Sequence, residues 1–330
     1  MIFGERDYYK PFMYPWAFEY FKQQHQSHWM PESVPMAQDV RDWQTEDADT
    51  KELLRNVFRF FTQADMDVGS NYYDTIIPWF HHPELRMMLG AFADMEGIHQ
   101  YAYSYLLDTI GLPEREYKAF AEYPEMVAKH EYYSTLGVDG SEPTIPAMLR
   151  FIAANSAFGE GMQLFSTFAL LMNLPRNGKY IGVGQIIAWS IRDETLHVEG
   201  MLKLFNTIVD EHPDVWTDDF KRTIYNLCRN MVKLEDAFID LIYKDVGSAA
   251  YGLSKDELKE YIRYIADRRL LQMRLKPNYN VTNNPLPWLD DMLAAPEFTN
   301  FFETTPTEYS KHAWTGSWDE VWADAAPHTD

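Results

Sequence analysis

The stretch Ile191-Arg-Asp-Glu-Thr-Leu-His197 contains a Glu-x-x-His pattern, and Glu96-Gly-Ile-His99 contains the one other copy in the sequence. On an α-helix, side chains three residues apart lie about 60° apart around the axis and one turn apart along it. A carboxylate and an imidazole in this arrangement can reach the same metal ion. A single copy is more typical of an exposed polar pair, but two copies on two long helices favour a metal site.

Both motifs lie on apolar helical faces, where an isolated carboxylate would be costly. The first face comprises Leu89, Phe92, Glu96, His99, Tyr103 and Leu106, and the second comprises Ile187, Ile191, Glu194, His197 and Met201. Two further long apolar helices each carry one acid on the apolar face, namely Asp65 and Glu160. Asp65 precedes Glu96 by 31 residues and Glu160 precedes Glu194 by 34, so each half repeats the same order of ligands.

Together these positions supply four carboxylates and two imidazoles from four helices. This is the ligand set of the ferritin-like di-iron and di-manganese carboxylate proteins. Four carboxylates in one apolar space would repel one another and take up protons, whereas two divalent cations would balance their charge. Oxygen ligands combined with imidazole suit iron or manganese better than copper or zinc. The predicted ligands are Asp65, Glu96, His99, Glu160, Glu194 and His197.

The spacing of apolar residues predicts an all-α fold, a ferritin-like helical bundle with additional helices. We expect long helices from about residue 50, over 83–110, 145–173, 179–210, 213–247 and 254–275, and a shorter one over 114–130. The first 45 residues are expected to form short helices and loops around the body. We predict one domain over residues 1–303 and a flexible tail over residues 304–330.

Composition excludes several classes of function. The chain has 330 residues, a net charge of −21 and one cysteine, Cys228. The acidic surface argues against nucleic-acid binding and against docking on anionic membranes. A single cysteine excludes an internal disulfide framework and a cysteine-rich metal site. With no signal peptide and no apolar run of about 20 residues, we expect a cytoplasmic protein.

The chain resembles the small, radical-generating β subunit of class I ribonucleotide reductase. The likeness extends from Tyr9-Lys-Pro-Phe12 to Thr307-Glu-Tyr-Ser310, and residues 96–103 and 191–197 look like that family's two Glu-x-x-His helices. The resemblance implies the same six metal ligands. It implies two metal ions per chain, with iron first and manganese or a mixed manganese–iron pair as alternatives. It also implies a homodimer and a separate large (alpha) subunit that reduces ribonucleotides.

The resemblance assigns roles to four further residues. Tyr103 lies about 40° around the helix from His99, so it points towards the metals and is the expected site of a stable radical. The alternative is that the metals themselves keep the oxidising equivalent. Trp29 and Asp193 match residues of the family's electron relay. Tyr309, in the tail, is the expected relay tyrosine at the large subunit.

The surroundings of Tyr103 depart from the common family pattern. Leu164 stands where phenylalanine is frequent and Ser190 where an aliphatic residue is usual, whereas Phe168 is retained. A more polar pocket would shield a tyrosyl radical less well, which leaves the location of the radical open.

The tail is expected to dock on the large subunit. Trp318, Val321 and Trp322 would share one face of a short helix, which could lie in a groove of the partner.

Two other functions remain open from the sequence. A dimetal oxidase or monooxygenase with its own small substrate would have no use for Trp29 or a tail tyrosine. An iron-storage ferritin is less compatible with the long aromatic N-terminus and the tail.

Overall fold

The structure is a computed structural model that describes residues 1–136, 144–247 and 249–294, except for the side chains of residues 62–65, 67, 120, 133 and 134. The predicted tail, including Tyr309, lies outside these residues, so the domain boundary near 303 stays a prediction. In the described residues, helices dominate, and the one sheet is a short antiparallel pair, β1 (Ala249–Ala250) with β2 (Leu253–Ser254).

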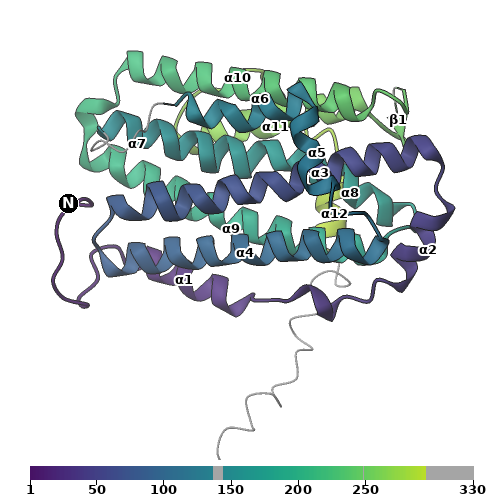
Figure 1. Ribbon diagram of the computed structural model, residues 1–330. Helices are drawn as coiled ribbons and strands as arrows, with labels where there is room; N and C mark the ends of the chain where they lie inside the picture. The colour runs from purple at the N-terminus through teal and green to yellow at the C-terminus, as the bar shows by residue number, and fades with distance from the viewer. Residues whose placement is uncertain (137–143, 248, 295–330) are drawn as a thin grey trace, which may run out of the picture.

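The bundle is built on long helices that run side by side. They are α3 (Ala48–Ser70), α4 (Pro83–Ile110), α9 (Ile181–Glu211) and a broken helix over residues 145–176. Figure 1 shows α1 (Pro15–Gln26) along one side of α4, and α10 (Asp218–Ile242) at the opposite edge of the bundle. α6 (Pro124–Ser134) and α11 (Lys255–Gln272) pack on α10. The four long helices therefore enclose the central core that carries both Glu-x-x-His motifs.

The ends of α4 and α11 follow local sequence signals. Pro83 occupies the first turn of α4, where its missing N–H costs nothing. Gly111 ends that helix with a φ of 78°, and the amide of Leu112 donates to the carbonyl of Leu107. Ser254 and Glu257 form the capping box that the sequence predicts for α11. The predicted boundaries of both helices are therefore close to the observed ones.

The start of α9 is fixed by the short helix α2 (Ala37–Thr45). The Asp39 carboxylate is fully buried and accepts hydrogen bonds from the amides of Gly182 and Val183, at 3.2 and 2.8 Å. Asp42 accepts from the amide of Tyr180 at 2.8 Å. Amides in the first turn of a helix have no partner within it, and acids there also complement the helix dipole. The N-terminal segment thus holds the helix that carries the second motif.

The sequence predicts one continuous α-helix over residues 145–173, but the structure divides it. α7 (Ile145–Ile152) leads into a π-helix, η5 (Ala153–Gln163), and α8 (Leu164–Arg176) follows. Every residue from 151 to 174 is buried, so this helix has no solvent-facing side. The apolar residues that the sequence places around Glu160 are therefore not a distinct buried face, because the whole circumference of the helix is buried, including polar residues such as Asn155 and Gln163.

The π-helix is held by α11. The buried guanidinium of Arg269 donates from Nε to the carbonyl oxygen of Gly161 at 2.8 Å. A Cβ atom on Gly161 would lie 2.8 Å from Arg269 Nε and 3.0 Å from the carbonyl oxygen of Ser156. Glycine is therefore required here for the close approach of the arginine. π-helical turns of this kind often occur at functional sites, and Glu160 lies in this one.

Other parts of the chain differ from the expected boundaries. The region predicted as one short helix over 114–130 contains α5 (Glu116–Ala119), a 3-10 turn and then α6. The helix expected over 213–247 is α10, preceded by the 3-10 turn Pro213–Val215. A further short helix, α12 (Pro287–Leu293), lies in the Pro- and Asn-rich region where we expected none. Among the described helices, none combines the length and apolarity needed to cross a bilayer.

Candidate metal centre

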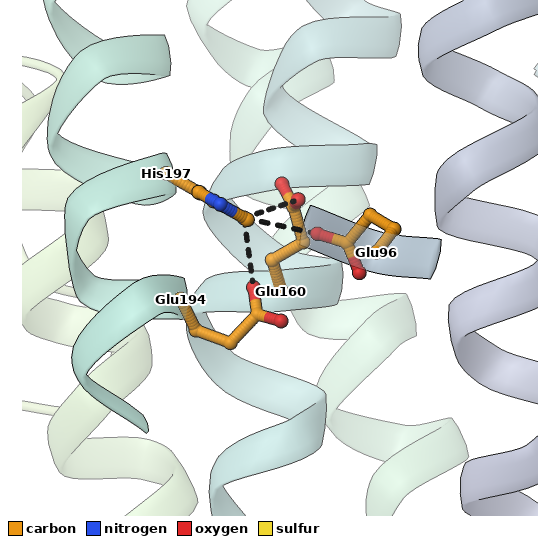
Figure 2. Close-up of side chains that lie close together, drawn as sticks. All are labelled: Glu96, Glu160, Glu194 and His197. Carbon is orange, nitrogen blue, oxygen red and sulfur yellow. Dashed lines mark ion pairs between the residues drawn. The ribbon is translucent and has the colours of Figure 1, made fainter. Parts of the chain in front are cut away.

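Five of the six predicted ligands meet in the core of the bundle. Glu96 and His99 come from α4, Glu160 from η5, and Glu194 and His197 from α9. All five side chains are at most 1% exposed. Figure 2 shows the three glutamates converging on His197. The sixth predicted ligand, Asp65, belongs to α3, but its side chain lies outside the described part of the structure, so its role stays a prediction.

Glu96 and Glu194 lie between the two imidazoles. The Oε1 and Oε2 atoms of Glu96 lie 2.9 Å from His197 Nδ1 and 3.5 Å from His99 Nδ1, respectively. Those of Glu194 lie 3.1 Å from His99 Nδ1 and 3.6 Å from His197 Nδ1. Of the two imidazoles, Glu160 approaches that of His197, with its Oε1 atom 3.7 Å from His197 Nδ1. The cluster therefore has two ends, one at His99 and one at His197, joined by two central carboxylates.

Burial and mutual charge shift the protonation of this cluster. Burial alone would lower the pKa of both imidazoles, but the close polar contacts with the surrounding carboxylates raise the pKa of His99 and His197 well above the usual value. Burial alone would raise the pKa of Glu96, yet the two imidazoles lower it. Burial, with added repulsion from Glu194 and Glu96, raises the pKa of Glu160 to about 7. Without a cation, the cluster must hold extra protons.

The donor set fits a metal site. Six buried atoms of the cluster make no hydrogen bond of good geometry to any described residue, namely Glu96 Oε1 and Oε2, His99 Nδ1, Glu160 Oε1, Glu194 Oε2 and His197 Nδ1. Ligand atoms of Glu96, Glu160, Glu194 and His197 lie within 4.8 Å of one another. Buried polar atoms without partners are costly, and divalent cations would satisfy all of them by displacing the protons.

Asp193 and Trp29 lie directly behind His99. The Trp29 indole Nε1–H donates to Asp193 Oδ2 at 2.7 Å, and His99 Nε2 lies 3.4 Å from the same oxygen. The rings of Trp29 and His99 have centroids 6.0 Å apart. Arg192 donates to Asp193 Oδ1 at 2.8 Å, which helps keep this buried carboxylate ionised. Three predicted functional residues are therefore connected by polar contacts, in the order His99, Asp193 and Trp29.

Tyr103 lies on the same side of the cluster and is buried, with 4% exposure. Its hydroxyl donates to Ser190 Oγ at 3.0 Å. The ring packs against Phe61, with a centroid distance of 4.7 Å, and Phe61 in turn stacks on Phe168 at 5.4 Å. The serine that departs from the common pattern is thus a direct partner of the predicted radical site.

Two residues at the site were missed by sequence reasoning. Tyr72, in the π-helix η2 (Asn71–Ile76) that follows α3, donates a hydrogen bond from its hydroxyl to Glu160 Oε2 at 3.2 Å. Gln24, on α1, lies between Asp193 and His197. Tyrosine fits an apolar helical face, so the sequence around Tyr72 does not indicate a contact with a metal ligand. Gln24 lies two helical turns after Ala17, which is also buried, so this spacing could have indicated that Gln24 shares the buried face of α1.

The chain matches known proteins over most of its length. Residues 6–285 match the family model described as "Ribonucleotide reductase, small chain". The chain is 43% identical to a probable ribonucleoside-diphosphate reductase small subunit of Invertebrate iridescent virus 6, over 96% of this chain and 97% of that protein. It is 31% identical to a ribonucleoside-diphosphate reductase subunit beta of Chlamydia pneumoniae, over 91% and 88% of the two chains.

A solved structure agrees in fold. A ribonucleotide reductase subunit from Clostridium botulinum superposes with a TM-score of 0.78, at 22% identity, over 85% of this chain and 88% of that chain. The family match over residues 6–285 and the relatives at 43% and 31% identity favour a reductase small subunit over an independent oxidase or a storage ferritin. The chain belongs to the family of ribonucleotide reductase small chains and is the small subunit of a ribonucleoside-diphosphate reductase.

Proposed function

We propose that this small subunit binds two metal ions at the buried cluster and generates there the oxidising equivalent that the large subunit uses. The observation that carries the proposal is a fully buried set of three carboxylates and two imidazoles with unpartnered ligand atoms. The proposed ligands are Asp65, Glu96, His99, Glu160, Glu194 and His197. Iron is proposed first, with a manganese pair or a mixed manganese–iron pair as alternatives, because the donor set suits either metal.

The residues of the cluster have separable tasks. His99 and His197 present their Nδ1 atoms to the centre, one at each end. Glu96 and Glu194, each close to both imidazoles, are placed to contact both ions, and Glu160 serves the His197 end. We propose that Asp65 serves the His99 end, which the described contacts leave with one fewer carboxylate. A bound dimetal pair supplies the one-electron oxidising power.

The chain of contacts behind His99 suits electron transfer. Trp29 is 3% exposed, so it can lose and regain an electron away from water. Asp193 Oδ2 accepts a hydrogen bond from the Nε1–H group of Trp29. It is therefore placed to hold that proton when the indole is oxidised. Arg192 compensates the negative charge of Asp193. We propose that the oxidising equivalent leaves the site through His99, Asp193 and Trp29, as the family resemblance implies.

We propose Tyr103 as the residue that stores the equivalent between turnovers. Burial against Phe61 limits contact with water, which would otherwise quench a radical. The hydrogen bond to Ser190 gives the phenol a nearby hydroxyl. Storage on the metals remains the alternative, because this polar partner shields a tyrosyl radical less well than an aliphatic one.

The partners are proposed from the family. We propose a homodimer that works with a large subunit, in the cytoplasm. The tail, residues 304–330, would dock on that subunit, and Tyr309 would carry the equivalent across the interface.

The test is complementation with the cognate large subunit. The two purified chains together should convert ribonucleoside diphosphates to deoxynucleotides, and each alone should not. Metal analysis should give two ions per small subunit, and electron paramagnetic resonance should detect a tyrosyl or metal-centred signal. Deleting residues 313–330 should leave metal loading intact and greatly weaken binding of the large subunit. Full synthesis by the truncated chain at low subunit concentration would contradict the docking role.

A further inference from the structure

Gln24 is an uncharged polar side chain buried beside the metal cluster. It is 2% exposed and lies near the end of α1, which packs against both α4 and α9. Ser27 bonds to the carbonyls of Gln23 and Gln24, and its own carbonyl accepts from Arg192 at 2.6 Å. The end of α1 is therefore fixed against α9. A buried amide needs both a donor and an acceptor partner, so its two contacts are informative.

Those two contacts join opposite ends of the site. The amide nitrogen of Gln24 lies 3.4 Å from Asp193 Oδ1, and its oxygen lies 3.0 Å from His197 Nε2. The Asp193 carboxylate can only accept, because it is ionised, so the NH2 group of Gln24 must face it. The amide oxygen must then face His197, which fixes the proton of that imidazole on Nε2. In the neutral form of His197, the form that can bind a metal, the lone pair is consequently on Nδ1, the atom that faces the glutamates.

His99 is held in the same tautomer by a different partner. Its Nε2 faces the carboxylate of Asp193, whereas the Nε2 of His197 faces a neutral amide. A hydrogen bond to a carboxylate makes an imidazole more basic than a hydrogen bond to an amide does, and partners of this kind tune the metal affinity of the site. The two ends of the cluster therefore differ in the strength of their imidazole ligands.

We propose that Gln24 is a positioning residue of the dimetal site, which holds His197 as the Nε2–H tautomer and so sets the metal affinity of the His197 end more than that of the His99 end. Without Gln24, Asp193 would still accept hydrogen bonds from Trp29 and Arg192, so the support of His99 would be largely kept. This inference rests on the proposed dimetal function. Gln24 itself does not touch the ligand atoms that face the centre; it acts through His197. Its loss should affect the metal position at His197 more strongly than the one at His99.

The decisive experiment compares the Gln24→Met and Gln163→Met variants. Each variant is titrated with Mn²⁺, and the electron paramagnetic resonance signal of the unbound Mn²⁺ gives the affinity of each binding step. Gln163 is also a buried glutamine, at 4% exposure, but it donates to the carbonyl of Met231 on α10, away from both imidazoles. Gln24→Met should weaken one of the two binding steps by about 10- to 100-fold and the other much less. Gln163→Met should leave both steps unchanged. Equal weakening of both steps in both variants would reduce Gln24 to a packing residue and overturn the proposal.

A second measurement needs no variant and so does not depend on folding of a mutant. In the Zn²⁺-loaded wild-type protein with ¹⁵N-labelled histidine, His197 should show a metal-shifted Nδ1 and a slowly exchanging proton on Nε2. A His197 that binds zinc through Nε2 would overturn the proposal. If the wild-type chain fails to bind two ions at all, the proposed dimetal function fails first. If it binds two and Gln24→Met binds them identically, only the role of Gln24 fails.

Discussion

The His99 and His197 ends of the cluster carry the same motif in different surroundings. Behind His99 lie Asp193, the Trp29 indole and Arg192, all connected by hydrogen bonds. Behind His197 lies the neutral amide of Gln24. The near-repeat of the two ligand sets therefore does not extend to the residues that support them. From this difference we infer that the His99 end exchanges electrons with the rest of the protein, whereas the His197 end mainly holds a metal.

The largest expected effect comes from removing a ligand at the His197 end. Glu160→Ala should abolish binding of one of the two ions and with it nucleotide reduction, because it deletes a buried carboxylate that approaches His197. Metal analysis after loading measures the stoichiometry. The matched control is Glu84→Ala, which removes another fully buried carboxylate, one that accepts from the amides of Met13 and Tyr14. Two ions bound at wild-type affinity in Glu160→Ala would show that Glu160 is not a ligand.

The His99 end should instead be sensitive in turnover. Trp29→Phe should bind two ions normally and lose deoxynucleotide synthesis to background, since phenylalanine is much harder to oxidise and has no N–H for Asp193. Synthesis with the large subunit is the measurement. Trp216→Phe is the control, because Trp216 packs against Phe205 and Phe220, outside the cluster. Normal turnover by Trp29→Phe would remove the functional distinction between the two ends.

Tyr103→Phe separates storage from transfer. The ring is kept and the oxidisable hydroxyl is lost, so the tyrosyl signal should disappear and synthesis should stop if Tyr103 is the store. Tyr105→Phe, on another face of α4, should retain both. Electron paramagnetic resonance of the freshly activated chains makes the comparison. Retained activity with a metal-centred signal would eliminate Tyr103 as the essential store and place the equivalent on the metals.

The smallest effect is expected from the hydroxyl partner of Tyr103. Ser190→Ala removes two buried hydrogen bonds, the one from the Tyr103 hydroxyl and the one that Ser190 donates to the carbonyl of Ile186. The free energy of unfolding should therefore fall by about 1–2 kcal/mol. Denaturant unfolding of the metal-free chains measures it. Metal stoichiometry should not change, because Ser190 contacts no ligand in the described residues. Loss of an ion in this variant would mean that the Tyr103 pocket and the metal site cannot be treated separately.

The cluster itself could largely be predicted from the sequence. An acid on an apolar helical face has a high free energy unless it is paired, so Glu96 and Glu194 stand out without any structure. Glu160 also stands out, although for a different reason than the pattern suggested, since η5 is buried on all sides. The π-helix has no sequence signal of its own, because its apolar and small residues fit an α-helix equally well.

The supporting residues are harder to find, because their roles depend on contacts over long sequence separations. Gln24 is 173 residues from His197 and carries no charge that would make its burial conspicuous. Trp29 and Asp193, 164 residues apart, have no local pattern, and the family resemblance supplied them. Tertiary contacts decide which polar side chain lies behind each imidazole, and helical periodicity records only which face is buried.

The contact between Arg269 and Gly161 bears on any attempt to transplant this site into a minimal scaffold. A four-helix design that copied only the segments with the ligands would leave out α11 and its guanidinium. The carbonyl of Gly161 would then lose its buried donor, at a cost of about 1–3 kcal/mol. The backbone next to Glu160 would be free to return to ordinary α-helical winding and to turn the carboxylate away. A scaffold that reproduces this metal centre must therefore include α11, although this helix contributes no predicted ligand.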